Sequence, residues 1–333
     1  MMATGCDLCL KGAKMVLFVT GVCGFSCWYC PLSEERWQKD VVYANERPVR
    51  CDEDMLEEAR AMDALGTGIT GGDPVVRLER TLYYAALLKN EWPDHHIHLY
   101  TASHLNGDIL KMMEGLIDEL RFHLIDFSDI SVVHKALKYQ FEVGVEIPMI
   151  PSRVKETQSL IQRLKGIGVH FVNINELEYA DRTVEEMRKR KFTLSNDSCI
   201  VEESSEAAAR VMQDEIVHYC SAHDKDSIQL RNRFTRRAAN IRKPYEDIED
   251  GMLVKGVIVC CSHEAAQHIR ALLLEKVDIP EAFVEVLGER VETHWALVEE
   301  AVPWIKPAAC TIKIGIEKRY PTYNQPLIEY IPL

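Results

Sequence analysis

The segment Cys23-Gly-Phe-Ser-Cys27-Trp-Tyr-Cys30 carries three cysteines within eight residues, close behind a β-branched and aromatic stretch at residues 15–20. That stretch is typical of a buried strand that ends just before Cys23. Ligands in α/β folds bind where strands end, so the cysteine loop stands at an expected ligand position. Thiolates at this short spacing can hold one face of an iron–sulfur cluster and leave a fourth iron open.

The composition excludes several broad classes of protein. The 333 residues are 47% hydrophobic and 27% charged, a balance that excludes a disordered chain, a collagen-like fibre and a membrane bundle. No apolar run approaches the roughly 20 residues that span a bilayer. The formal charge of −13 excludes a uniformly basic coat for nucleic acid. Eleven cysteines without a secretory signal favour reduced thiols in the cytoplasm, used for metal binding or catalysis.

Two further metal sites can be drawn from the cysteines. Cys6 and Cys9 pair with Cys27 and Cys30 across seventeen residues, a spacing that fits the four-cysteine zinc site of a non-catalytic zinc ribbon. This alternative leaves Cys23 unused, although Cys23 belongs to the same loop. Alternatively, Cys6, Cys9 and Cys220 form a second metal site, iron–sulfur or zinc, beside the cluster of the cysteine loop.

The Cys-x3-Cys-x2-Cys spacing, with Tyr29 before the last cysteine, resembles the signature of the radical S-adenosylmethionine (radical SAM) superfamily. The resemblance implies that Cys23, Cys27 and Cys30 hold a [4Fe-4S] cluster, with Tyr29 packed over it. It also implies that the open iron binds S-adenosylmethionine. An electron from a donor such as ferredoxin or flavodoxin would then release a 5′-deoxyadenosyl radical, which abstracts hydrogen from a substrate.

Other segments extend this resemblance. Gly71-Gly-Asp-Pro is similar to the Gly-Gly-Glu-Pro segment of the superfamily, which implies that Gly71, Gly72 and Asp73 contact the methionine amino group. Residues 124–126 and 147–151 resemble the activating enzymes of glycyl-radical enzymes such as pyruvate formate-lyase, whose substrate is a protein. At strand ends, the contacts predicted for the ribose or carboxylate of the cofactor are Ser103, Asp126, Glu146 and Arg153.

Strand and helix patterns alternate as far as about residue 180. The strands are expected at residues 15–20, within 66–74 before a Gly-Gly turn, and at 96–101, 120–127, 141–150 and 169–177, followed by a helix at 205–217. Six such steps predict a partial, open (β/α)6 barrel, the core of the superfamily. The predicted domains are an N-terminal Cys-x2-Cys segment at 1–12, the barrel and following helices at 13–243, and a small C-terminal α/β domain at 244–333. The last would hold strands near 254–261, 311–316 and 327–331, and helices at 263–275 and 291–302.

A basic stretch bears on the choice of substrate. Residues 225–243 carry seven basic side chains against one acidic, and Arg233, Arg236 and Arg237 recur at helical spacing. Such a face is either solvated or binds RNA phosphate or an acidic protein. The sequence therefore predicts a cytoplasmic radical SAM oxidoreductase that acts on a protein or an RNA, and the acidic whole-chain charge weighs against RNA.

Overall fold

The computed structural model describes residues 2–195, 199–276, 279–306 and 311–333. The chain divides into two compact units. The first contains Met1–Arg60 and Ala64–Leu230, and the second contains Ala61–Asp63 and Arg231–Leu333. Within the described residues, no helix has both the length and the apolar character needed to cross a membrane.

A nine-stranded sheet forms the first unit, in the order β3-β2-β1-β4-β5-β6-β7-β8-β9. The short strands β2 (Tyr43–Ala44) and β3 (Arg47–Pro48) pair antiparallel at the β1 edge. The other strands run parallel: β1 (Lys14–Phe18), β4 (Gly66–Thr70), β5 (His96–Thr101), β6 (Glu119–Phe122), β7 (Glu142–Pro148), β8 (Phe171–Asn175) and β9 (Val217–Cys220). The predicted α/β class with a parallel barrel sheet is confirmed.

The prediction of six parallel strands was wrong by one. The helix expected at 205–217 is only α8 (Glu202–Ala209), and the chain then returns to the sheet as β9. All four β9 residues are half-buried, so this strand has no apolar run that would mark it in the sequence. The seventh parallel strand extends the open edge of the barrel beyond β8.

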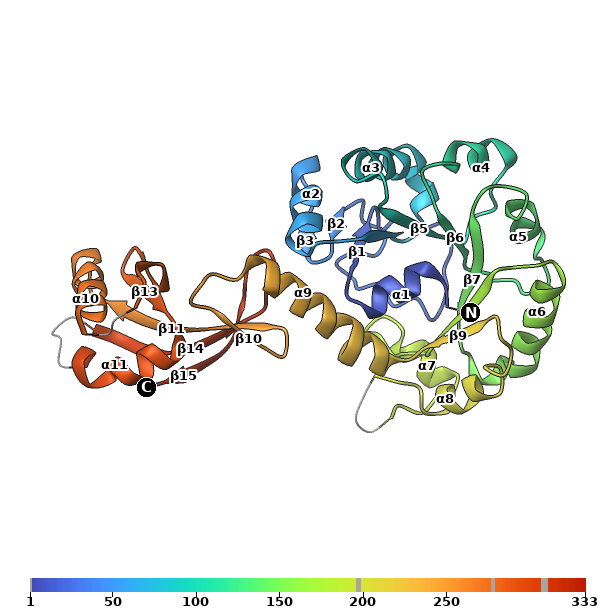
Figure 1. Cartoon of the computed structure of the whole chain (residues 1–333). Helices are drawn as coiled ribbons and strands as arrows, with labels where there is room; N and C mark the ends of the chain where they lie inside the picture. The colour runs from blue at the N-terminus through green and yellow to red at the C-terminus, as the bar shows by residue number, and fades with distance from the viewer. Residues whose placement is uncertain (1, 196–198, 277–278, 307–310) are drawn as a thin grey trace. The chain divides into compact units, whose positions relative to one another are not determined.

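Helices cover the outer face of the curved sheet, and Figure 1 shows them ringed around it. They include α3 (Leu78–Glu91), α4 (Gly107–Met113), α5 (Ser131–Ala136) and α6 (Val154–Gly166). Side chains alternate between the two faces of each strand. On β5, Ile97 and Leu99 are fully buried in the apolar outer layer, whereas His98 and Tyr100 point inward. The inner face of the barrel is therefore polar.

A short helix, α1 (Thr4–Leu10), packs against inward-facing residues at the start of the strands. The Gly5 amide donates to Glu119 Oε2 at 2.9 Å, and Arg121 Nη2 lies 3.3 Å from Cys6 Sγ. A Cβ atom at Gly5 would lie 2.4 Å from His98 Nδ1, so only glycine permits this approach. The helix closes the floor of the barrel.

The second unit is an antiparallel sheet in the order β12-β13-β11-β14-β15, with β10 (Asp247–Glu249) paired to β11. Its core follows a βαββαβ order. The elements are β11 (Met252–Cys260), α10 (His263–Lys276), β12 (Val284–Leu287), β13 (Arg290–Thr293), α11 (Trp295–Ile305), β14 (Thr311–Arg319) and β15 (Leu327–Pro332). The predicted helix at 291–302 was wrong at its start, because residues 290–293 form β13 and the helix begins only at Trp295.

Candidate active site

A cavity of about 760 Å³ opens at the carboxyl ends of the barrel strands and extends down its inner face. The predicted site residues that line it are Cys23, Cys27, Cys30, Tyr29, Gly71, Gly72 and Glu146. Deeper lining positions follow the inward alternation of the strands: Lys14 and Val16, Gly68 and Thr70, His98 and Tyr100. The three cysteines and the start of β1 therefore border one continuous space.

The cysteine loop is held by hydrogen bonds that the sequence did not reveal. Gln38 has a positive φ of 55° and reaches back to Cys23, donating from Nε2 to the carbonyl at 2.8 Å. The Cys23 amide in turn donates to Gln38 Oε1 at 3.4 Å. Burial raises the pKa of both the Cys23 and the Cys27 thiol, and the charge of neighbouring thiolates adds to the effect. Without a ligand these thiols therefore favour their protonated form, and a positively charged ligand would be needed to stabilise them as thiolates.

The two glycines after β4 fix the loop from the other side. The Gly72 amide donates to the Thr20 carbonyl at 2.7 Å, and the next amide donates to the Val22 carbonyl at 3.0 Å. A Cβ atom on Gly71 would lie 2.4 Å from the Thr20 carbonyl oxygen, and one on Gly72 would lie 2.5 Å from that of Val22. Larger residues would therefore push the segment that leads into Cys23 out of place.

A charged brace supports the same segment from outside the cavity. Asp40 accepts hydrogen bonds from Thr20 Oγ1 at 2.9 Å, Arg77 Nε at 3.0 Å and Arg80 Nη1 at 2.6 Å. Chiefly the Arg80 hydrogen bond holds the pKa of Asp40 well below its usual range. Arg80 also donates to the Val19 carbonyl at 2.9 Å, which ties the end of β1 to α3. These residues have no motif of their own in the sequence.

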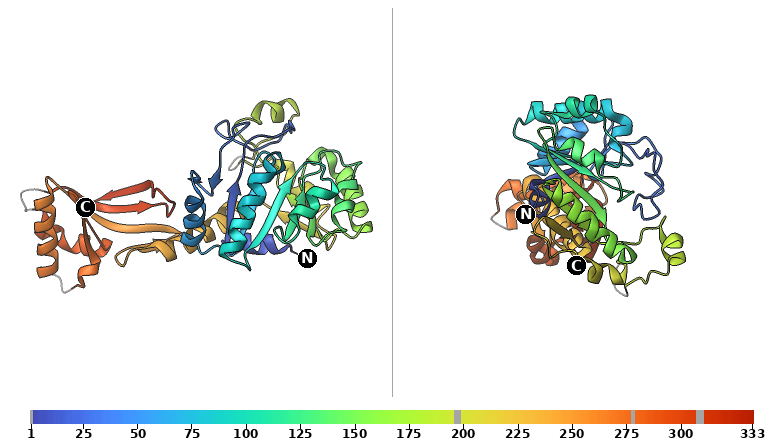
Figure 2. Two further views of the ribbon diagram at one scale, coloured as in Figure 1. Left: turned by 90° about the horizontal axis from the view of Figure 1, so that it is seen from above. Right: turned by 90° about the vertical axis from the view of Figure 1, so that its right-hand side faces the viewer.

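Aromatic side chains flank the cysteines. The Tyr29 hydroxyl lies 2.9 Å from His123 Nε2, and His123 Nδ1 lies 3.1 Å from the Glu146 carbonyl oxygen. A carbonyl oxygen only accepts, so Nδ1 carries the proton and Nε2 accepts from Tyr29. Trp28 stacks on Phe192 with ring centroids 5.9 Å apart, and Figure 2 shows the cysteine loop beside α7 (Val184–Lys189).

The structure gives Asp73 a full set of protein partners. Its carboxylate accepts from Val75 N at 3.1 Å, Ala102 N at 3.1 Å, Thr101 Oγ1 at 2.9 Å and Ser103 Oγ at 2.8 Å. It is 1% exposed and does not line the cavity, and neither does Ser103. Both residues therefore join the end of β4 to the end of β5, and the cofactor contacts predicted for them are not part of the cavity wall.

Two other predicted contacts lie elsewhere. The Asp126 side chain accepts from the Ser128 amide at 2.8 Å in the segment after β6, which ends at Phe122 rather than at residue 127 as predicted. Arg153 pairs with Glu156 at 2.5 Å and borders a separate hollow of about 360 Å³ with Trp28. Neither residue lines the cavity that contains the cysteines.

Glu146, in contrast, lies at the centre of a buried network, of which sequence reasoning missed Arg121 and Glu119. Its carboxylate accepts from Arg121 Nη1 at 2.7 Å, Asn173 Nδ2 at 3.0 Å and Asn175 Nδ2 at 2.9 Å. Burial alone would raise the pKa of Glu146, but the charge of Arg121 and these hydrogen bonds lower it. Arg121 also pairs with Glu119, so one guanidinium holds two carboxylates. In the sequence, only the inward alternation of side chains on the three strands β6, β7 and β8 could have indicated this set.

The four cysteines of the zinc-ribbon alternative are not brought together. Cys6 contacts Arg121 and Asn173 on the barrel floor, whereas Cys27 and Cys30 line the cavity at the other end of the strands. Among the described residues, these thiols form no group within the distances of a tetrahedral zinc site. The alternative of a zinc ribbon was therefore wrong for this fold.

The second metal site predicted from Cys6, Cys9 and Cys220 has another arrangement. Cys9 Sγ lies 2.7 Å from Gln229 Oε1, and Gln229 Nε2 lies 3.4 Å from Cys220 Sγ. Cys6 instead faces the Arg121 guanidinium. Gln229 therefore links Cys9 to Cys220, whereas Cys6 has other partners.

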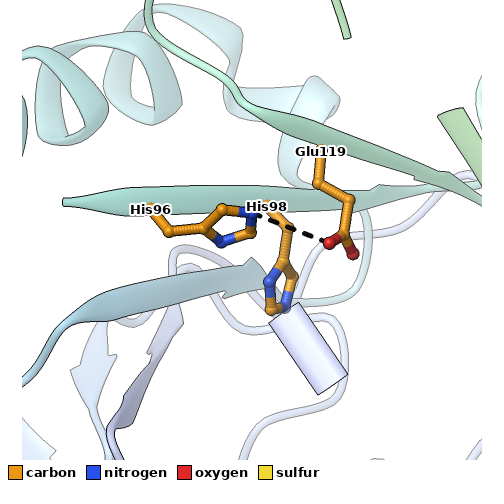
Figure 3. Close-up of side chains that lie close together, drawn as sticks. All are labelled: His96, His98 and Glu119. Atoms are coloured by element: carbon orange, nitrogen blue, oxygen red, sulfur yellow. Dashed lines mark ion pairs between the residues drawn. The ribbon is translucent and has the colours of Figure 1, made fainter. Parts of the chain in front are cut away.

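His96, His98 and Glu119 converge on the barrel floor, with ligand atoms within 4.8 Å of one another (Figure 3). Several of their polar atoms already have partners, whereas Nδ1 of His96 and Nδ1 of His98 are buried without a hydrogen-bond partner. Glu119 accepts from the Gly5 amide and from Arg121, and His98 Nε2 lies 3.3 Å from Lys14 Nζ. Two cations beside the cluster disfavour a metal ion, so this group is a polar core cluster.

The residues around the cavity fit an iron–sulfur cluster and a cofactor of nucleoside size. Three thiols border one space, soft sulfur ligands suit iron–sulfur clusters, and the volume lies in the range of small-molecule sites. The Gly71–Gly72 backbone borders the same space without side chains.

Comparisons with known proteins identify the family. The family model described as a 4Fe-4S single cluster domain matches residues 11–135, and a domain of unknown function matches residues 251–333. The chain is 37% identical over 350 residues to the "Putative glycyl-radical enzyme activating enzyme" of Methanocaldococcus jannaschii, covering 99% of this chain and 92% of that protein.

Solved structures resemble only part of the chain. The methyltransferase TsrM of Kitasatospora setae, a radical S-adenosylmethionine enzyme, is 11% identical with a TM-score of 0.38 over 57% of this chain and 41% of its own. The enzyme anSMEcpe with bound AdoMet is 13% identical with a TM-score of 0.35, over 48% and 49% of the two chains. Since the Methanocaldococcus relative matches nearly the whole length, the chain belongs to that relative's family and is a radical SAM enzyme.

Proposed function

We propose that this enzyme cleaves S-adenosylmethionine reductively at a [4Fe-4S] cluster held by Cys23, Cys27 and Cys30, and abstracts hydrogen from a protein substrate. The observation that carries the proposal is the convergence of these three thiols on one cavity with the Gly71–Gly72 turn. When bound, the reduced cluster and its cofactor supply one-electron cleavage of the sulfonium followed by hydrogen abstraction.

The chain's own residues orient the ligands and shield them. Gln38 and the Gly71–Gly72 turn fix the loop that presents the thiols. Tyr29 donates a hydrogen bond to His123 and keeps its proton beside the cysteines, because burial and the charge of Cys27 raise its pKa. These contacts support a role for Tyr29 in packing over the cluster rather than in proton transfer.

A protein substrate is favoured over RNA by two observations. The Methanocaldococcus relative is named as an activating enzyme, which acts on a protein. The basic stretch is largely used inside the second unit, on helix α9 (Arg231–Ile241). Arg237 is 6% exposed and donates to the Pro321 carbonyl, while Arg236 donates to the Met62 and Asp63 carbonyls. Guanidinium groups held in this way contribute little to binding phosphate.

Anaerobic reconstitution tests the cluster. We expect about four irons per chain and an EPR signal of the reduced protein that changes when S-adenosylmethionine is added, with 5′-deoxyadenosine as product. Cys27→Ala should lose the iron and the product. Cys51→Ala is the matched control, because Cys51 is exposed and does not line the cavity. Zinc without iron after reconstitution would contradict the proposal.

Deuterium transfer tests the substrate class. Extract from cells of the source organism, grown in deuterated medium, is separated into protein and RNA fractions and offered to the reduced enzyme. Deuterium in 5′-deoxyadenosine should come from the protein fraction and disappear after protease treatment. Transfer from the RNA fraction alone would overturn the choice of a protein.

Three further parts of the proposal concern surroundings of the site. The electron donor is a low-potential carrier such as ferredoxin or flavodoxin, which should replace dithionite in the assay. The cytoplasm is the proposed location, because reduced thiols persist there. For Cys6, Cys9 and Cys220, the hydrogen bonds of Cys9 and Cys220 to Gln229 and the contact of Cys6 with Arg121 favour a site without metal, and about eight irons per chain would instead support a second cluster.

A further inference from the structure

Lys14 is a buried cation that lacks an anionic partner. It begins β1, is 8% exposed and lines the cavity. Its Nζ lies 3.3 Å from His98 Nε2, and no carboxylate oxygen of the described chain lies within 4.0 Å of it. Burying an ammonium group without a counter-ion is costly, so its position in a cavity wall calls for an explanation.

The neighbouring groups do not neutralise it directly. Glu146 and Glu119 are both held by Arg121, and Glu178, which also lines the cavity, pairs with Lys225. Arg121 carries one positive charge and its two carboxylate partners carry two negative charges, so one negative charge remains. This charge offsets that of Lys14 only at a distance.

His98 is neutral, because burial and the charges of Lys14 and Arg121 lower its pKa well below the usual range. His98 therefore accepts one N–H of Lys14 at Nε2. Two N–H groups of the ammonium remain for a ligand. The Tyr100 hydroxyl, which accepts from Arg121 at 3.1 Å, lines the same part of the cavity and adds one more donor.

Building on the proposed function, we propose that Lys14 binds a carboxylate of the substrate at the end of the cavity opposite the cysteines. A carboxylate fits better than a phosphate, since a single ammonium is a point charge and the nearby Arg121 guanidinium is already paired with Glu119 and Glu146. Glu146, although paired, also borders this region and disfavours a dianion. The carboxylate would be that of a free acid or of an acidic side chain.

Such a contact would act as an anchor. A five-residue strand such as β1 spans about 17 Å, so Lys14 and the cysteine loop lie at opposite ends of the cavity. A substrate fixed at Lys14 presents the same C–H bond to the reacting end on every encounter, which is how positioning lowers a barrier. Lys14 is a binding and positioning residue in this scheme.

Thermal unfolding of the reconstituted full-length protein tests the proposal without any radical chemistry. The probes are succinate and glutarate, their uncharged diamides, and a capped, glycine-rich heptapeptide containing one Glu or one Gln. An acid probe at roughly twenty times its Kd should raise the melting temperature by about 3 °C or more, and its neutral partner should not. Lys14→Met should abolish the shift, and Lys14→Arg should retain part of it.

The control variant is Lys155→Met, since Lys155 is exposed on α6 outside the barrel and should leave the shift unchanged. If Lys14→Met does not fold, Lys14→Gln takes its place. A shift with the free acids identifies a small carboxylate, and a shift with the Glu peptide alone identifies a protein side chain. No shift with any acid, or an equal shift in Lys14→Met, would overturn the proposal. If the protein takes up no iron on reconstitution but still shows the shift, the result contradicts the proposed function and leaves the carboxylate site at Lys14 standing.

Discussion

Each unit of the chain buries a lysine on a strand, and the two lysines are treated differently. Lys255 of β11, 5% exposed, donates to Glu246 at 3.0 Å and to Glu292 at 2.7 Å. Lys14 of β1, 8% exposed, has a neutral imidazole as its hydrogen-bond partner. The lysine that stabilises the fold has carboxylate partners within the protein, whereas the lysine that lines the cavity has N–H donors left for a ligand.

The rest of the C-terminal network follows the same rule as Lys255. Glu317 is 5% exposed and accepts from Arg290 at 2.5 Å and from Arg319 at 2.8 Å. Tyr245 donates to Glu285 at 2.6 Å. These charges lie on the sheet face opposite α10 and α11, because β11 alternates between Ile258 in the helix-side core and Lys255 on the other face.

The largest effect is expected for Lys255→Met. The change leaves Glu246 and Glu292 buried without their cation, and should lower the free energy of unfolding of the C-terminal unit by roughly 3–5 kcal/mol. Hydrogen exchange of β11 and β14 amides in the full chain measures it. Lys276→Met, at an exposed pair with Glu275, should change the value by less than about 0.5 kcal/mol. Unchanged exchange in Lys255→Met would mean that the ion pairs of Lys255 do not stabilise the unit, and the contrast with Lys14 would fail.

The barrel floor can be tested through its packing. Gly5→Ala places a Cβ atom 2.4 Å from His98 Nδ1, and should cost about 1–3 kcal/mol through displacement of α1. Gly166→Ala is the matched control, because a Cβ atom at the end of α6 meets nothing within 4 Å and should be neutral or slightly stabilising. Hydrogen exchange of α1 amides distinguishes them, and equal behaviour of the two variants would mean that the floor is loosely packed.

Acidification should weaken the balanced network of the C-terminal unit. Burial alone would raise the pKa of Glu317, but hydrogen bonds and charge from Arg290 and Arg319 lower it. A lowered folded-state pKa means that the stabilising contribution is complete above about pH 4.3, the unfolded value, and is lost as the pH falls through the folded value.

Hydrogen exchange of β14 amides, with equilibrium unfolding between pH 6 and pH 3, should show this loss. Glu317→Gln should be less stable at pH 6 by about 1–2 kcal/mol and show a shallower slope toward low pH. A slope as steep as that of the wild-type protein would assign the acid sensitivity to other carboxylates.

The smallest effect on stability is expected for Lys14→Met. Replacing a buried ammonium that has no carboxylate partner with an apolar chain of similar length should change the free energy of unfolding by no more than about 1 kcal/mol, or raise it. Denaturant unfolding of the full chain, followed at the barrel, gives the number. A loss as large as that of Lys255→Met would show that both lysines serve the fold alone.

The sequence predicted those parts of the fold that carry a strong local pattern. The strand expected at 141–150 is β7, and the helix expected after it is α6, because long periodic runs dominate their neighbourhoods. The helix α1 has seven residues and no side-chain cap, and β9 has four half-buried residues, so neither has a local signal. The position of α1 is determined by partners more than 100 residues away in the chain, and that of β9 by its pairing with β8.

The candidate site divides in the same way. The cysteines and glycines could be named from a motif, because their spacing is local. Asp73 was expected at the cofactor, but its short side chain bonds to its own turn and to the end of β5. Lys14 and Arg121 could not be predicted as site residues from the sequence, because the role of each depends on side chains on other strands.

The closing of the barrel floor by α1 has a consequence for the order of folding. Gly5 contacts Glu119, 114 positions later in the chain, and Cys6 contacts Asn173, 167 positions later. The helix α1 can therefore form these contacts only after β6 and β8 have joined the sheet. Contacts between residues so far apart in the sequence form slowly. We expect the cavity to be complete only in the last step of folding, so that a half-made barrel would offer the cysteine loop to metal before it could hold a substrate.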